Sequence, residues 1–256
     1  MFNDVKINEE TIETLLEKGV KLEKQCKELL MQKKRKEYAI PFNELWDLLE
    51  DSENSDERNE LAMRFASVID FLGVICHDSF DFLGLCGAYN DAYSLANIIP
   101  ESLDMAMTRV RLVIGVLKFK FRFNTFDNVN SYIVELLPVT MRFLDNEEFI
   151  VNSAACLCNL LQLCPYDHSV FARCMIEILD QISLLADYFP QNSTLQLTYL
   201  RSLVFFVCFA KQRLIDEIYD KYYEKTKDTF ILRKAIIEER DLQEMQQALL
   251  ACNIRL

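Results

Sequence analysis

Four apolar segments that recur every 44 residues constrain the fold of this chain more than any other feature. They begin at Glu60, Asp104, Glu148 and Asn192. Aligned without gaps, the segments share four columns that are apolar in every copy, and three of these columns are spaced i, i+4 and i+7, as on one helical face. The columns are Met63/Met107/Val151/Leu195, Val68/Leu112/Cys156/Leu200, Leu72/Val116/Leu160/Val204 and Ile75/Phe119/Leu163/Val207. The spacing predicts stacked helical repeats, with an irregular helical array as the alternative.

The amino-acid composition favours the same fold class. Apolar residues make up 51% of the 256 residues, which is too many for a disordered chain. Only 5 glycines and 5 prolines are present, fewer than an all-β or nucleotide-loop protein of this length normally uses for its turns. We therefore expect an all-α protein.

Helical patterns and their breaks predict the domain organisation. One long helix is expected over 9–38, ended by Pro41, and a second over 42–49. These helices would form an N-terminal arm (1–50), followed by an acidic loop (51–60) and a helical-repeat body (61–256). Within the body, further helices are expected between the repeat segments, over 131–144 and 169–186. Two more polar helices, over 211–227 and 230–251, are expected to cap its C-terminal end.

Residues 146–160, NEEFIVNSAACLCNL, resemble the passage from the second to the third helix of an armadillo repeat. The resemblance implies a right-handed α-solenoid of armadillo/HEAT-like repeats. It also implies that Asn159 lies on a concave groove and bonds the backbone of an extended peptide. The sequence departs from the family where Ala155 replaces its groove tryptophan. The residues 44 positions from Asn159 are not asparagine but Phe71, Gly115 and Leu203.

The net charge of −12 is concentrated in one part of the chain. Residues 41–110 hold 14 acidic and 3 basic side chains. Such a segment disfavours nucleic acid and favours a basic partner. We therefore regard the acidic segment 41–60 as a docking candidate for a basic partner.

Residue patterns that carry chemistry are weak in this sequence. The five glycines form no phosphate-binding motif, and Gly84 and Gly87 are expected to break a helix. Cys156 and Cys158 are two positions apart on an expected helix and so point in different directions, although Cys164 and His168 follow them. We expect no catalytic residues, no metal and no cofactor, and thus a protein that is not an enzyme.

Two basic stretches each allow more than one interpretation. Residues 118–123 alternate cations with phenylalanines, which suits an amphipathic helix end, a contact with anionic groups of a protein, or a surface that stacks nucleic-acid bases. Lys33, Lys34, Arg35 and Lys36 have the composition of a nuclear import signal, or form the basic last turn of the first helix.

The resulting hypothesis is a non-catalytic adaptor or scaffold that binds a peptide or helix of a partner protein within a larger complex. The partner-binding candidates are Asn159, Arg111, Arg201, Lys118, Lys120 and Arg122. The alternative is a HEAT-type RNA-processing or translation scaffold that contacts RNA through Lys118, Lys120, Arg122 and the basic cluster 33–36, although nucleic acid is the less favoured partner. Nine cysteines without disulfide-type spacing favour an intracellular location, cytoplasmic or nuclear. No membrane partner is expected, because polar residues interrupt the longest charge-free run, 149–166, and we expect that run to be a buried helix.

Overall fold

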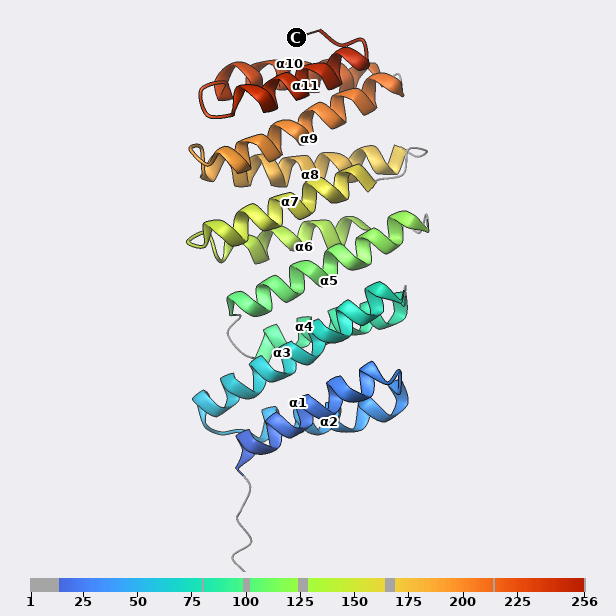
Figure 1. The fold of residues 1–256 in the computed structure, drawn as a ribbon, viewed down its shortest axis with the longest axis vertical. Coiled ribbons are helices and arrows are strands. Elements are labelled where there is room, and N and C mark those ends of the chain that lie inside the picture. The colour runs from blue at the N-terminus through green and yellow to red at the C-terminus, as the bar shows by residue number, and fades with distance from the viewer. Residues whose placement is uncertain are drawn as a thin grey trace, which may run out of the picture. The chain divides into compact units, whose positions relative to one another are not determined.

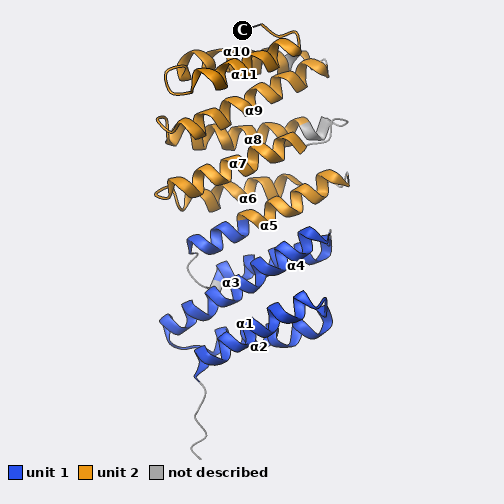
Figure 2. Ribbon diagram, in the orientation of Figure 1, with its two compact units in different colours: residues 1–109 blue, residues 110–256 orange. Residues whose placement is uncertain are grey.

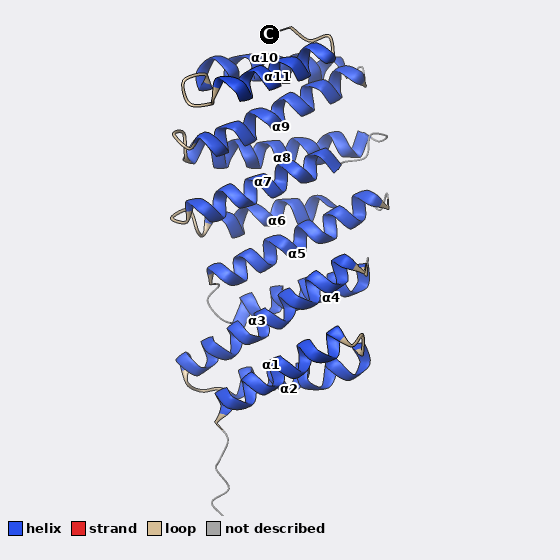
Figure 3. Cartoon of the chain, in the orientation of Figure 1, coloured by secondary structure: helices blue, strands red, loops and turns tan. Residues whose placement is uncertain are grey.

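A computed structural model describes residues 14–79, 81–98, 102–123, 129–163, 169–213 and 215–255. Over these ranges the chain forms eleven α-helices joined by short connections, and the described part contains no strand (Figures 1 and 3). The predicted all-α class is confirmed.

The chain divides into two compact units, residues 1–109 and residues 110–256 (Figure 2). Unit 1 contains four complete helices, α1 (Leu15–Met31), α2 (Arg35–Asp51), α3 (Ser55–Asp78) and α4 (Phe82–Ile98). Helix α5 (Leu103–Arg122) begins in unit 1 and ends in unit 2. Unit 2 continues with α6 (Val129–Met141), α7 (Glu147–Leu163), α8 (Ser169–Tyr188), α9 (Ser193–Gln212), α10 (Asp216–Arg233) and α11 (Glu239–Ala251).

Helix α3 organises unit 1 by packing against α1, α2 and α4. Its Phe65 is 1% exposed and lies 4.5 Å from Phe42 and 5.0 Å from Trp46, measured between ring centroids. Aromatic pairs at this separation add to the apolar area that they bury. Residues 14–51, expected to form a separate arm, therefore pack into the same compact unit as α3.

The predicted long first helix ends earlier than expected, at Met31. Gln32 and Lys33 form a turn, and Lys33 has a left-handed φ of 60°. The Lys33 amide donates to the Leu30 carbonyl at 3.0 Å, and the Lys34 amide donates to the Leu29 carbonyl at 2.9 Å. This is the Schellman arrangement that terminates helices. The chain then reverses and starts α2 at Arg35.

Pro41 lies inside α2 and does not end the first helix as predicted. It is buried on the core side of the helix, while Glu37, whose carbonyl loses its donor to the proline, is exposed. The predicted acidic loop over 51–60 is also shorter, because α3 begins at Ser55. The Asn54 side chain accepts from the Asp56 amide at 2.9 Å, so the acidic residues that follow lie in the first turn of a helix.

Helix α9 lies at the centre of unit 2 and contacts α7, α8, α10 and α11. Among the described residues it alone is long and apolar enough to cross a membrane, with a mean hydropathy of 1.3. However, 61% of that stretch is buried inside the protein, as in a core helix. Leu200, Leu203 and Phe206 are each 0% exposed. The charge-free run predicted to be a buried helix lies in α7 as far as Leu163 and is largely buried there; its last residues, 164–166, lie outside the described ranges.

Side-chain hydrogen bonds join alternate helices through residues at a similar separation along the chain. In unit 1, Lys27 of α1 donates to Ser67 of α3, 40 residues further on. In unit 2, the same separation of 40 residues joins α9 to α11 at three successive places. Because the separation is constant, α9 and α11 run in the same direction. Bonds between α6 and α8 span 44 and 48 residues, and an ion pair between α8 and α10 spans 46.

A buried glutamine fixes the turn between α8 and α9. Gln196 is 0% exposed, and its Nε2 donates to the carbonyls of Ala186 at 2.7 Å and Phe189 at 3.0 Å. Ala186 lies in the last turn of α8, where no helical donor reaches its carbonyl, and Phe189 lies just beyond the helix. The Gln196 side chain of α9 therefore supplies a hydrogen bond that α8 lacks and ties the turn to α9.

The four apolar segments of the sequence lie in α3, α5, α7 and α9. One of the four apolar columns, Leu72/Val116/Leu160/Val204, is buried in every copy. The first and last columns are less uniform, because Met63 is 54% and Leu163 50% exposed. The helices expected between the segments are α6 and α8, and the polar C-terminal helices are α10 and α11.

Candidate protein-binding face

Three cations lie along one stripe of α5 in unit 2. Arg111, Lys118 and Arg122 are spaced i, i+7 and i+11, which places them on one side of a helix. Arg111 and Arg122 are exposed, and Lys118 is half-buried. Arg122 and Lys120 lie in the last turn, where positive charge complements the helix dipole.

Two cations of the α5 stripe act electrostatically on helix α7. Burial raises the pKa of the Cys156 thiol on α7, and the positive charges of Lys118 and Arg111 oppose that rise. Asn159 is on the same helix as Cys156, almost one turn further on, and is exposed. Asn159 therefore lies at the surface of the helix on which the two α5 cations act.

Helix α9 contributes Arg201 on the other side of α7. Its Nη2 donates to Oδ1 of Asp241 on α11 at 3.0 Å, with 44% of the arginine side chain exposed. Burial raises the pKa of the Cys158 thiol on α7, whereas a hydrogen bond with Ser202 and the charge of Arg201 lower it. Arg201 therefore also lies next to α7, although part of its charge is neutralised by Asp241.

We name this surface of unit 2 the cationic face: Arg111, Lys118 and Arg122 of α5, Asn159 of α7 and Arg201 of α9. Figure 1 shows α7 between α5 and α9, with every second helix of the chain in this series. Five of the six predicted partner-binding residues therefore lie on three successive alternate helices of one unit.

The sixth predicted residue, Lys120, does not belong to the surface. Its residue is 7% exposed, and its Nζ lies 5.7 Å from the centroid of the Tyr132 ring on α6. The alternating cations and phenylalanines form the last turn of α5, with Lys120 on the buried side of the helix. Phe121 is buried, and the rings of Phe119 and Phe123 lie 4.4 Å apart on another side of α5.

The basic stretch 33–36 covers the end of the turn after α1 and the first residues of α2, and is not the basic last turn of one long helix. Arg35 pairs with Asp81, and its Nη2 also donates to Ser79 Oγ at 3.5 Å. Lys34 lies 3.7 Å from Glu37. Arg35 therefore connects the start of α2 to the turn between α3 and α4, and the nuclear import signal stays a prediction.

The acidic segment 41–60 presents most of its carboxylates to solvent from α2 and the start of α3. One of them has a defined partner, because Glu60 accepts from Arg64 at 2.6 Å. Others, at the start of α3, stabilise the helix dipole. These roles are structural, and docking of a basic partner here stays a prediction.

No three histidine, cysteine or acidic side chains of the described residues are grouped as metal ligands. His77 is exposed and lies 3.7 Å from its neighbour Asp78. Cys156 and Cys158 are free thiols on different sides of α7. Cys164 and His168 lie outside the described residues.

No protein-family model matches this chain, and a search of curated proteins finds no match.

The structure adds two residues that the local sequence pattern does not indicate. Cys156 on α7 is affected by the charges of Lys118 and Arg111, and Asp241 on α11 pairs with Arg201. The pairing of Arg201 with a residue 40 positions away has no local signal in the sequence. The stripe of Arg111, Lys118 and Arg122 does have one, because its spacing fits a single side of a helix.

Proposed function

We propose that this protein is a non-catalytic scaffold whose cationic face binds a peptide or helix of a partner protein. The single observation that carries this proposal is the stripe of Arg111, Lys118 and Arg122 on one side of α5, two of whose charges act on Cys156 of α7. An amide and several cations on adjoining helices supply hydrogen bonds to a peptide backbone and attraction for its acidic side chains.

We further propose that the helices form an α-solenoid of the armadillo/HEAT type. In support of this, bonds between alternate helices join residues separated by 40 to 48 positions. This range includes the repeat length typical of such solenoids, in which each helical unit contacts mainly its neighbours. Successive alternate helices of a solenoid present an extended surface, which suits a peptide that crosses several units.

The chemistry of the cationic face favours an acidic partner segment. Four of its five residues are cations, and one of these, Arg201, pairs with Asp241 of α11. The RNA-binding alternative used Lys118, Lys120 and Arg122 together with the basic cluster 33–36. Burial of Lys120 against Tyr132 removes one member of that set from the surface. We therefore favour protein over RNA as the partner.

The proposal is tested by capturing partners with tagged wild-type protein and with the charge-reversal variant Arg111→Glu/Lys118→Glu. We expect the principal partner to be depleted about tenfold or more by the variant, because like charges across an interface repel. Chemical crosslinking of the wild-type complex should join that partner to α5, α7 or α9.

A matched control is Lys24→Glu/Arg240→Glu, which makes the same change in net charge on other exposed surfaces. The control should retain the partner. Equal loss of the partner in both variants would show that net charge, and not the cationic face, governs binding. Circular dichroism of each variant verifies that it remains helical.

A further inference from the structure

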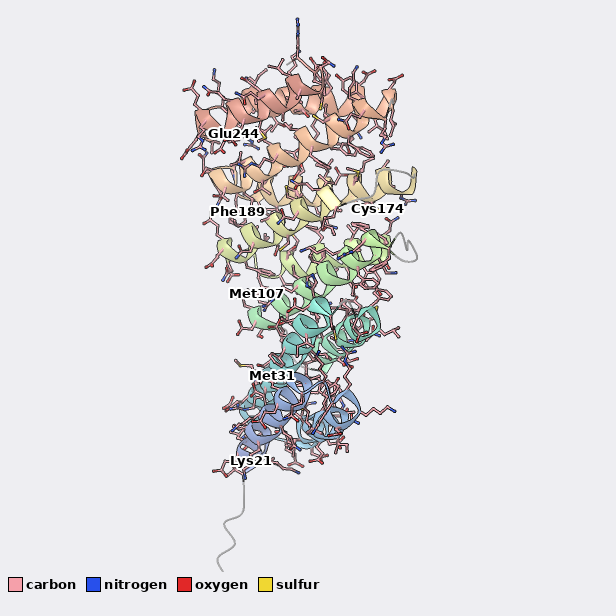
Figure 4. All side chains as sticks on the ribbon, turned by 45° about the vertical axis from the view of Figure 1, so that its right-hand side comes forward. Lys21, Met31, Met107, Cys174, Phe189 and Glu244 are labelled. Atoms are coloured by element: carbon pink, nitrogen blue, oxygen red, sulfur yellow. The ribbon has the colours of Figure 1, made fainter. Side chains whose placement is uncertain are left out.

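Helices α10 and α11 enclose a cavity of about 370 Å³ close to the turn that connects them. Its α10 wall consists of Lys227, Phe230, Ile231 and Lys234, spaced i, i+3, i+4 and i+7. The turn residue Lys234 retains helical backbone angles, so the four residues follow one side of the helix. The opposite wall, on α11, has the same spacing and includes Glu239 and Leu242. The cavity is therefore a groove between two helical faces, one of them on α11, the helix whose Glu244 is labelled in Figure 4.

The groove has an apolar floor and an exposed apolar lip. Phe230 is 8% and Leu242 7% exposed, so both are buried beneath the groove. Ile231 at the lip is 68% exposed, and its neighbour Leu232 is 70% exposed. Adjoining large apolar side chains that face solvent mark an interaction site more often than isolated ones do.

The charges of the groove are divided between its walls. Both lysines lie on the α10 wall, and the acidic residue Glu239 lies on the α11 wall. Lys227 is 3.9 Å from Glu224, but both side chains are largely exposed, and pairs of this kind contribute little. Glu239 Oε1 accepts from Gln243 Nε2 at 3.4 Å. The α10 wall therefore attracts negative charge.

We propose that this groove binds an amphipathic helix of a partner protein, with its apolar stripe on Phe230, Ile231 and Leu242 and acidic side chains facing Lys227 and Lys234. The two lysines are seven residues apart, a distance of about 10 Å along a helix. Acidic residues with the same spacing on the partner face both of them. An apolar stripe between those acids fills the groove, which is the helix-in-groove mode of recognition. This site is separate from the cationic face and does not depend on its function.

The test uses a display library of helical 16-residue peptides with a fixed leucine stripe and random flanking positions. Wild-type full-length protein should enrich peptides with Asp or Glu at two flanking positions seven residues apart. The variant Lys227→Glu/Lys234→Glu should bind the enriched peptides about tenfold more weakly and should itself enrich Lys or Arg at those positions. Ile231→Glu should also abolish enrichment, since it places a charge on the apolar lip.

The control Lys221→Glu/Arg240→Glu changes the same charges on the same two helices outside the groove, and it should bind the peptides as the wild type does. Peptides that bind the reversed-charge variant equally well, or enrichment that survives Ile231→Glu, would overturn the proposal. The other possible occupant of the groove is a second copy of this chain, and light scattering tests for such a dimer. A wild-type dimer that Ile231→Glu converts to a monomer would show that the groove holds a second copy of this chain, which also overturns the proposal.

Discussion

At the scale of single residues, the connection between α3 and α4 depends on a glycine. The Asp81 carboxylate begins α4 by accepting from the Gly84 amide at 3.1 Å, and it also pairs with Arg35. A Cβ atom at position 84 would lie 2.8 Å from Asp81 Oδ2 and still closer to Cys76 Sγ. From the sequence, this glycine was expected to break a helix. Instead it lies inside α4 and allows that helix to approach Cys76 of α3 closely. The contact forms only in the folded chain, so the local sequence does not reveal it.

Replacing Gly84 therefore tests this close contact. We expect Gly84→Ala to lower the free energy of unfolding by about 1–3 kcal/mol, because the added methyl group must displace two short side chains. Urea denaturation measures the change.

The matched control is Gly87→Ala on the same helix, where a Cβ atom would have no neighbour within 4 Å. Alanine should stabilise the protein there by up to about 1 kcal/mol through its higher helix propensity. Equal stability of the two variants would show that Gly84 is not in a restricted position.

Residue-scale electrostatics also connect α1 to α3. Glu23 accepts from Lys27 at 2.7 Å and from Arg64 at 3.1 Å, with 18% of its side chain exposed. Burial raises the pKa of the Glu23 carboxyl, but the hydrogen bond and charge of Lys27, together with Ser67 and Arg64, lower it below its usual 4.5. A carboxyl with a lowered pKa in the folded state stabilises the protein above the unfolded pKa. That contribution is lost as the pH falls through the folded value.

We therefore expect Glu23→Gln to destabilise the protein at pH 7 by about 1 kcal/mol, because two cations lose their charged partner. The difference from the wild type should shrink as the pH falls below about 4.5 and disappear below the lowered pKa of the folded carboxyl, where Glu23 is neutral in both states. Denaturation curves at a series of pH values measure it. A difference that stays constant down to acid pH would contradict the assignment.

At the scale of elements, helix type was easier to predict than helix ends. The apolar spacing in α7 and α9 indicated both helices, because each buries one continuous side. The end of α1 was missed, because Lys33 is not the glycine that normally adopts a left-handed φ at a helix end. The prediction that Pro41 ends the first helix was also wrong. Proline usually ends helices, but this one is accommodated within α2.

The substitution Lys33→Gly should change the stability in opposite directions for a helix α1 that ends before Lys33 and for a helix that continues through position 33. With a left-handed Lys33, Lys33→Gly should stabilise the protein by about 0.5–1 kcal/mol, because glycine adopts that φ without strain. If one continuous helix passed through position 33, the same change would cost about 1 kcal/mol. Thermal or urea denaturation decides between them. Lys33→Ala is the control, since it removes the same charge but keeps the Cβ atom, and it should give no gain.

At the scale of the whole molecule, the sequence predicted the all-α class and the position of the alternate helices, but only part of the candidate site. Asn159 and the α5 stripe were predicted from local patterns. The effect of the Arg111 and Lys118 charges on Cys156 could not be predicted from the sequence, because it depends on how the helices are placed in the folded protein. Lys120 was placed on the surface because lysine is rarely buried. Its contact with Tyr132 depends on how α6 packs on α5.

The central claim is that the cationic face binds a partner protein, and photo-crosslinking from Asn159 tests it most directly. A photoreactive amino acid replaces Asn159 in one protein and Glu244 of α11 in another (Figure 4). We predict a crosslink to one defined partner from position 159, lost when Arg111→Glu/Lys118→Glu is added, and none from position 244. A crosslink to that partner from position 244 and none from position 159 would contradict the claim.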